Sequence, residues 1–284
     1  YTTLFRSDAM SGVVNVITKT PTKEGGSATI GVGNMGSQTY KINYGTPRFL
    51  IGIERGFFGK QDPSTPVHTD SVDHPRGYEY YTARDKGNSI GIFMSGKLSD
   101  KVTLNFSRFE GKSAYAQLST ESNATNRNRH STTYAYDDSK NNASLIYKDG
   151  NTTGTLFYND RDLKGKNRKH SLPSYTSNDS NYIARQYGFD VQHEWDFRGG
   201  KDYLIAGVLG KRETYRTTSG PVYANPHRHS LALYGSYSYQ INPKWTTILG
   251  LRYTDIKDPV KNQHVLTPQF QLNHRINKES SVYM

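Results

Sequence analysis

The 284-residue sequence contains no cysteine, 2 tryptophans and 4 methionines. Without cysteine, disulfide bonds, thiol nucleophiles and thiolate metal sites are excluded. No apolar run approaches the ~18 residues that a membrane-spanning helix needs, which excludes a helical membrane protein. A nucleotide-binding loop of the form Gly-x-x-x-x-Gly-Lys-Ser/Thr is also missing. These absences leave strand-built proteins open.

Tyrosine and positive charge are abundant. There are 22 Tyr against 11 Phe, and the net charge is +11. Tyrosine is a good strand former and suits a membrane–water interface. The charge implies attraction to anions such as lipopolysaccharide, an anionic ligand or nucleic acid. The mean hydropathy of -0.79 does not decide between a soluble and a membrane protein, because a wide barrel keeps apolar residues at every second position only.

Several segments alternate strictly between apolar and polar residues. Between residues 187 and 196, one face carries Tyr187, Phe189, Val191, His193 and Trp195, and the other carries Gly188, Asp190, Gln192, Glu194 and Asp196. Residues 245–253 repeat the pattern, with Leu249 and Leu251 on the apolar face. Such a period of two predicts half-buried strands. Residues 203–209 do not assign to a face by this criterion.

Thirteen strands are predicted in this way. They cover residues 26–34, 37–45, 48–59, 87–98, 102–118, 131–148, 152–163, 181–197, 202–217, 227–241, 244–257, 264–276 and a last one from 280. From the third strand on, long connections near 60–86, 119–130, 164–180, 218–226 and 258–263 alternate with short turns. In an up-and-down barrel, every second connection lies at the same rim, with short periplasmic turns and long extracellular loops. A soluble β-sandwich or propeller has no reason to place its long loops on one side.

A short motif near the N-terminus points to one family. Residues 7–19 read Ser-Asp-Ala-Met-Ser-Gly-Val-Val-Asn-Val-Ile-Thr-Lys, a small-residue turn followed by a β-branched strand. This run resembles the end of the plug domain of TonB-dependent outer-membrane receptors, and Asp8, Ala9, Gly12, Val13, Val14, Asn15, Ile17 and Thr18 carry the match. The resemblance implies a plug that ends near residue 25 and a barrel wall from residue 26 onward.

The fold class expected from these features is all-β: a partial antiparallel up-and-down transmembrane β-barrel, preceded by the last strand of a plug. Barrels of the family have about 22 strands, so thirteen would make up part of the wall of a longer receptor. Residues 1–7 do not fit the family pattern and resemble the translation of a short-read sequencing adapter. We therefore expect them to be a library artefact.

Basic segments in two expected extracellular loops are the main candidates for ligand binding. One contains Arg127 and Arg129, and the other contains Lys164, Lys166, Arg168 and Lys169. Arginine presents a planar fork to carboxylate, phosphate or catecholate oxygens, and lysine adds a point charge. The same residues could instead contact lipopolysaccharide phosphates or face solvent. Tyr78, Tyr80, Tyr81 and Tyr223 could stack on a planar ligand or belong to an aromatic girdle.

No catalytic constellation, cofactor motif or metal-ligand set is evident. His227 and His229 share a strand face but lack a third ligand, and no nucleic-acid-binding module is recognisable. The resemblance implies a transporter without catalysis that imports a metal chelate. A ferric siderophore is the first choice, with haem and cobalamin next. Its partners would be the TonB–ExbB–ExbD complex and outer-membrane lipid, including lipopolysaccharide. A plug-free barrel (porin or barrel hydrolase) and a soluble all-β binding protein are the alternatives.

Overall fold

The structure is a computed structural model that describes residues 23–59, 67–71, 74–84, 87–121, 129–171, 174–217, 226–277 and 280–283. The plug-end motif, from Asp8 to Thr18, and residues 1–7 lie outside the described residues. Among the described residues, no helix is long and apolar enough to cross a membrane.

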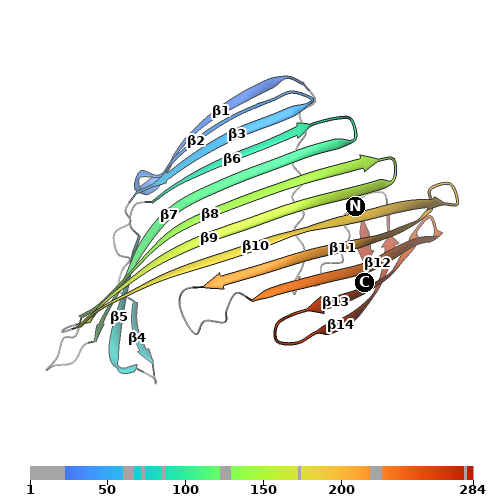
Figure 1. Cartoon of the computed structure of the whole chain (residues 1–284). Helices are drawn as coiled ribbons and strands as arrows, with labels where there is room; N and C mark the ends of the chain where they lie inside the picture. The colour runs from blue at the N-terminus through green and yellow to red at the C-terminus, as the bar shows by residue number, and fades with distance from the viewer. Residues whose placement is uncertain are drawn as a thin grey trace.

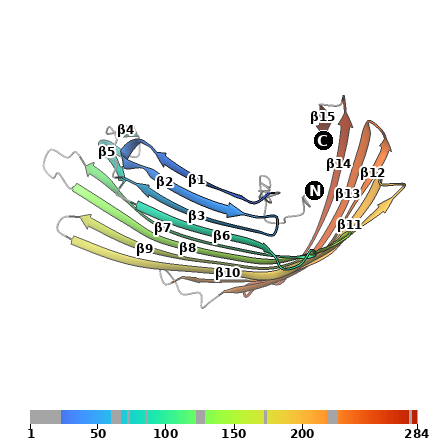
Figure 2. The same cartoon turned by 90° about the horizontal axis from the view of Figure 1, so that it is seen from above.

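The described chain forms one antiparallel sheet (Figure 1). Its strands are β1 (Gly25–Val32), β2 (Gln38–Gly45), β3 (Phe49–Phe58), β4 (Val67–Ser71), β5 (His74–Arg84), β6 (Gly87–Lys97), β7 (Val102–Glu121), β8 (Arg129–Asp149), β9 (Thr152–Ser171), β10 (Ser174–Phe197), β11 (Asp202–Thr217), β12 (His227–Asn242), β13 (Trp245–Lys257), β14 (Gln263–Arg275) and β15 (Ser281–Tyr283). A single 3-10 turn, η1 (Asn34–Gly36), joins β1 to β2. Apart from β4 and β5, the strands pair in chain order, which confirms the thirteen-strand up-and-down path. The sheet bends into an arc whose ends do not meet (Figure 2).

Two expected loops are instead strand. Within the connection 60–86, β4 and β5 form a hairpin, and β5 pairs with the distal part of β7 through Arg84 and Tyr115. The connection expected at 164–180 is a continuation of β9 and β10, which remain paired up to Ser171 and Ser174. A membrane strand needs about 9–11 residues, so strands of 20 and 24 residues continue well past the bilayer. Their backbone groups stay paired with each other there, because cross-strand bonds satisfy them.

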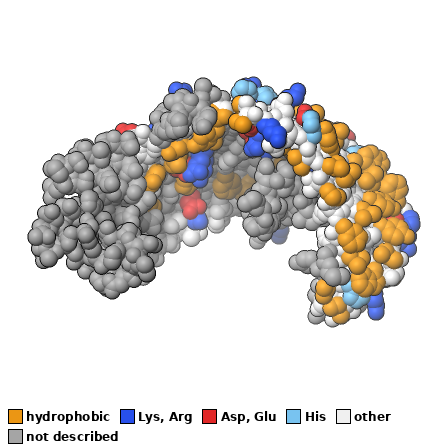
Figure 3. Space-filling model, turned by 90° about the horizontal axis from the view of Figure 1, so that it is seen from below, with side chains coloured by type: hydrophobic (Ala, Val, Ile, Leu, Met, Phe, Trp, Pro, Cys, Tyr) orange, Lys and Arg blue, Asp and Glu red, His pale blue; other side chains and the backbone are white. Residues whose placement is uncertain are grey.

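The register places the apolar positions of neighbouring strands side by side. Leu104, Leu145, Leu156, Phe189 and Leu231 lie in one transverse row. On β13 and β14, this face exposes large apolar side chains such as Leu249 (51% exposed) and Phe270 (66% exposed). The alternation predicted for residues 187–196 and 245–253 is confirmed. Figure 3 shows hydrophobic side chains gathered on this side of the wall, which we call the convex face.

The opposite, concave face is polar and more enclosed. Its β12 and β13 positions include Ser238, Arg252 and Thr254, which are 2%, 5% and 3% exposed. Curvature brings these side chains together, and the same curvature spreads those on the convex face. The segment that alternation could not assign is fixed by its partners, because Leu204 lies opposite Trp195 and Tyr237 and therefore belongs to the convex face.

The turn between β10 and β11 is fastened to β12 by a buried carboxylate. Asp202 is 1% exposed, forms a two-pronged ion pair with Arg198, and accepts the backbone N–H of Gln240 at 2.9 Å. The Arg198 guanidinium in turn lies 4.5 Å from the ring centroid of Tyr239. Asp202 precedes Leu204, the first convex apolar residue of β11, so it sits at the rim beyond the apolar band. The hydrogen bonds from Arg198 lower the pKa of Asp202 to about 2.

Candidate ligand-binding surface on the concave face

A row of bonded polar side chains crosses the concave face. Asn159, Gln186, Glu213 and Arg228 occupy directly opposed positions on β9 to β12. Asn159 Nδ2 donates to Gln186 Oε1 at 3.2 Å, and Gln186 Nε2 donates to Glu213 Oε1 at 3.0 Å. Arg228 Nε completes the row by donating to Glu213 Oε2 at 3.0 Å. We call these four residues the concave ladder.

A second polar group lies one step along the strands. Asp138 on β8 is held by Arg161 through two bonds of 2.8 and 3.0 Å, and Lys140 Nζ lies 3.2 Å from the same carboxylate. Lys140 and Arg161 occupy opposed positions on β8 and β9. Two cations therefore share one carboxylate, which leaves a local excess of positive charge next to the ladder.

A groove of about 640 Å³ joins the ladder to this cationic group. Its lining includes Lys140, Arg161, Gln186, Glu213, Tyr215 and Arg228. The groove offers N–H donors of charged groups together with amide and carboxylate oxygens and one aromatic ring. Such a set suits a polar ligand that carries several oxygen atoms and a net negative charge.

The concave face also carries a buried cluster on β10 and β12. Tyr234, 7% exposed, donates its hydroxyl to Asp190 Oδ1 at 2.7 Å and lies 3.3 Å from Gln192 Oε1. The hydroxyl end of the Tyr234 ring covers Gly207, where an added Cβ would lie 2.5 Å from the hydroxyl oxygen. The cluster therefore ties β10, β11 and β12 together across the sheet. Its hydroxyl and carboxylate groups are engaged with each other rather than directed to a ligand.

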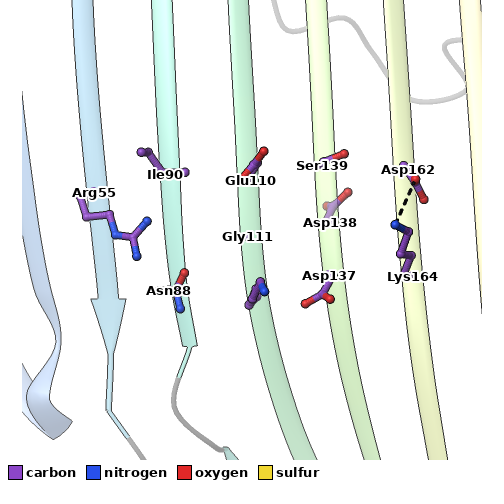
Figure 4. A pocket seen from close by; sticks show the side chains of 11 residues that line it. Arg55, Asn88, Ile90, Glu110, Gly111, Asp137, Asp138, Ser139, Asp162 and Lys164 are labelled. Atoms are coloured by element: carbon purple, nitrogen blue, oxygen red, sulfur yellow. Dashed lines mark ion pairs between the residues drawn. The ribbon is translucent and has the colours of Figure 1, made fainter.

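The predicted basic residues that the structure describes with side chains do not join the groove. Lys164 lies opposite Asp137 on the convex face and lines a separate pocket of about 410 Å³ (Figure 4). Its ammonium group is 3.8 Å from Asp162, and Glu110 also lines this pocket. Lys166, two positions further along β9, shares the convex face.

The other predicted site residues are placed by backbone only or not at all. Arg129 begins β8, Arg168 and Lys169 lie on β9, and Tyr78, Tyr80 and Tyr81 lie on β5. Arg127 and Tyr223 lie outside the described residues. The ligand role of these residues stays a prediction.

Sequence reasoning missed the concave ladder. Gln186 and Glu213 are ordinary polar residues, and only the cross-strand register shows that they meet. The available signal was the polar half of each alternating strand. His227 and His229 contact each other edge to face at 5.6 Å between ring centroids. Within the described ranges, no group of three or more His, Asp or Glu residues could hold a metal ion.

Comparison with known proteins shows which family this barrel wall resembles. The family "TonB dependent receptor-like, beta-barrel" matches residues 34–284. Among solved structures, Pseudomonas aeruginosa FpvA bound to heterologous pyoverdines has a TM-score of 0.59 at 12% identity and covers 93% of this chain and 42% of its own. A mutant of the P. aeruginosa ferric enterobactin receptor PfeA has a TM-score of 0.57 at 12% identity and covers 94% of this chain and 44% of its own.

The Acinetobacter baumannii ferric preacinetobactin receptor BauA is also similar, with a TM-score of 0.51 at 9% identity, covering 88% of this chain and 47% of its own. At these identities the structures show the fold. The chain thus covers less than half of each of these structures. A sequence search of curated proteins finds no match.

Barrels of this family lie in the outer membrane of Gram-negative bacteria, and its members are receptors and transporters rather than enzymes. The convex apolar face is therefore the lipid face, and the concave face lines the lumen. The soluble all-β alternative is excluded. With 34–284 covered by the family match and an up-and-down sheet of the expected polarity, this chain belongs to the TonB-dependent receptor β-barrel family.

Proposed function

We propose that this chain forms part of the barrel of a receptor that imports a ferric siderophore, with haem and cobalamin as the next candidates. The TonB–ExbB–ExbD complex would supply the energy by acting on a plug whose last strand is the segment from Asp8 to Thr18. The surrounding partners would be outer-membrane lipid and lipopolysaccharide. A solute too large for a passive pore needs a blocked lumen, tight binding and an external energy source.

The observation that supports this ligand class is the groove on the concave face. Lys140, Arg161 and Arg228 bring cations to this lumen surface, and among the described residues Asp138 and Glu213 are the carboxylates that pair with them. The described lining of the groove as a whole contains four cations, with Arg185 as the fourth, and three carboxylates, Asp160, Glu213 and Asp258. Ferric complexes of catecholates and hydroxamates present rings of oxygen atoms and often carry negative charge. Guanidinium and ammonium groups bind such oxygens through charge-assisted hydrogen bonds.

Growth on single nutrients tests the proposal. A strain lacking its own receptors would express the complete receptor that contains this chain and would be supplied with one ferric siderophore, haem or cobalamin at a time. We expect growth on a ferric siderophore only, and none in the same strain without TonB. Growth on every source, or growth independent of TonB, would support the plug-free porin alternative instead.

Paired variants test the groove. Replacing Arg161 and Arg228 with Gln removes two cations of the groove, whereas replacing Lys97 and Lys148 with Gln makes the same charge change near the short-turn end of the concave face. A hydrogen bond to a charged group contributes about 1.5–3 kcal/mol, so we expect the groove pair to raise the Kd of the siderophore by at least ~10-fold. Binding assays on the purified receptor measure this, and an equal effect of both pairs would contradict it.

The predicted extracellular basic residues have their own test. Replacing Lys164, Lys166, Arg168, Lys169 and Arg127 with Ser removes a positive field at the mouth. If these residues attract the chelate, uptake and affinity fall most at low salt, because screening weakens charge steering as salt rises. Unchanged uptake and affinity at low salt would assign them to lipid or solvent.

A further inference from the structure

Three donors converge on the carboxylate of Glu213, the acidic member of the concave ladder. Gln186 Nε2 and Lys211 Nζ lie 3.0 and 3.3 Å from Oε1, and Arg228 Nε donates to Oε2 at 3.0 Å. Lys211 precedes Glu213 by two residues on β11, so both side chains belong to the concave face. One carboxylate is therefore shared by two cations and an amide.

The two cations differ in how far they reach into the lumen. The Lys211 side chain is 12% exposed, whereas the Arg228 side chain is 42% exposed. Among the described residues, Glu213 and Arg228 line the groove of about 640 Å³, and Lys211 does not. Arg228 is thus the cation that a solute in the groove can reach, and Lys211 holds Glu213 from within the wall.

The carboxylate of Asp138 is placed differently. It pairs with Arg161 and Lys140, which line the groove, but Asp138 itself is not among the described residues of that lining. Glu213 in contrast stands inside the groove beside the cation that it occupies. An anion that enters this part of the groove meets an Arg228 whose Nε is already bonded.

The burial of Lys211 explains why an acid is present in a groove that favours anions. A charged side chain removed from water needs a charged partner, and removing that partner is strongly destabilising. If Arg228 turns to a solute, Glu213 keeps its bonds with Lys211 and Gln186. The cluster can therefore release Arg228 without leaving the Lys211 ammonium group or the Glu213 carboxylate unpaired.

We propose that Glu213 is an internal competitor of the imported solute, because it occupies Arg228 until an anionic oxygen of the solute replaces it. Such an oxygen offers the guanidinium an equivalent charge-assisted hydrogen bond. A neutral oxygen forms a weaker bond and does not compensate for the broken ion pair. Glu213 thereby restricts Arg228 to anionic solutes. This inference rests on the proposed function, since it refines how the groove recognises what the receptor imports.

The test uses the complete receptor in detergent and tricarballylate, a small trianion at slightly alkaline pH, as the probe. Calorimetric titration measures the Kd of tricarballylate for the wild type, Glu213→Gln, Arg228→Gln and the double variant. Glutamine keeps the side-chain length and an oxygen that can accept from Gln186, but it lacks the charge that holds Arg228. The matched control, Glu194→Gln, makes the same change on the concave face near the short-turn end of β10.

An ion-paired hydrogen bond is worth at least about tenfold in an equilibrium constant, so we expect Glu213→Gln to lower the Kd of tricarballylate at least ~10-fold. This gain should vanish when Arg228 is also Gln, and Glu194→Gln should leave the Kd unchanged. A gain that persists without Arg228 would indicate repulsion at a distance and overturn the proposal. An unchanged or raised Kd in Glu213→Gln, or no binding by any variant, would overturn it too.

A shorter acid covers the case in which Glu213→Gln does not fold. Glu213→Asp keeps a carboxylate near Lys211 but is one methylene shorter, so it reaches Arg228 less well. It should also lower the Kd, again through Arg228, and an unchanged Kd would overturn the proposal. Growth on haem or cobalamin instead of a ferric siderophore would refute the proposed solute and leave this pattern of Kd values as it is. Growth on a ferric siderophore without any gain in the Glu213 variants would refute the competitor and leave the proposed function standing.

Discussion

A charge placed on the lipid face at mid-membrane depth should destabilise the barrel, whereas the same charge one residue away should not. Leu156 is 56% exposed on the convex face and lies four residues from Thr152, where β9 begins at the short-turn rim. At ~3.4 Å per residue and a tilt of ~40°, this places Leu156 ~10 Å into an apolar band ~25 Å tall. The side chain is therefore close to the bilayer midplane.

Arginine on the lipid face at the midplane costs about 2–4 kcal/mol, so we expect Leu156→Arg to lower the free energy of unfolding by that amount. The matched control is Thr155→Arg, because Thr155 faces the lumen opposite Asp190, which can pair with the new cation. Urea titrations of the complete receptor folded into phospholipid vesicles measure both variants. A cost below ~0.5 kcal/mol for Leu156→Arg, or an equal cost for Thr155→Arg, would refute the assignment of the two faces.

Two further outcomes concern packing and pH. A Cβ at Gly52 would overlap the ring of Phe93, whereas nothing lies within 4 Å of a Cβ at Gly91 on the same face. Gly52→Val should therefore lower the free energy of unfolding by ~1–3 kcal/mol through overpacking. Gly91→Val is the control, and equal urea midpoints for the two variants would contradict this. The lowered pKa of Asp202 means that its carboxylate stabilises the fold above the ordinary value of 3.8 and loses this effect as the pH falls toward about 2. Urea midpoints of the wild type and Asp202→Asn should accordingly differ at pH 5 and converge near pH 2, and a gap independent of pH would exclude the ion pair with Arg198 as its source.

Alternation and loop length predicted most of the wall, because both are local. The lipid-facing positions of Phe189 and Leu251 follow from the alternation within their own strands. The up-and-down order follows from the alternation of short turns with long connections. Features that depend on the partner strand could not be predicted from the sequence. The face of Leu204 became clear only from its pairing with Trp195, because residues 203–209 are apolar on both sides.

The sequence also did not predict which long connections contain strands, or which side chains meet across the sheet. Polar composition made residues 164–180 look like a loop, yet β9 and β10 pair through most of this segment, because in water a hairpin satisfies its backbone as well as one in a membrane does. The position of Lys164 on the convex face and the meeting of Gln186 with Glu213 both follow from register. Register is set by many pairings at once, so no single segment reveals it.

The concave ladder has a consequence for anything that slides along it. Its amides and charged groups are already engaged with one another, from Asn159 across to Arg228. A molecule passing over this surface exchanges one partner for another at every step, and each displaced group has a neighbour to return to. A solute can therefore leave the ladder without stranding a polar atom of these four side chains.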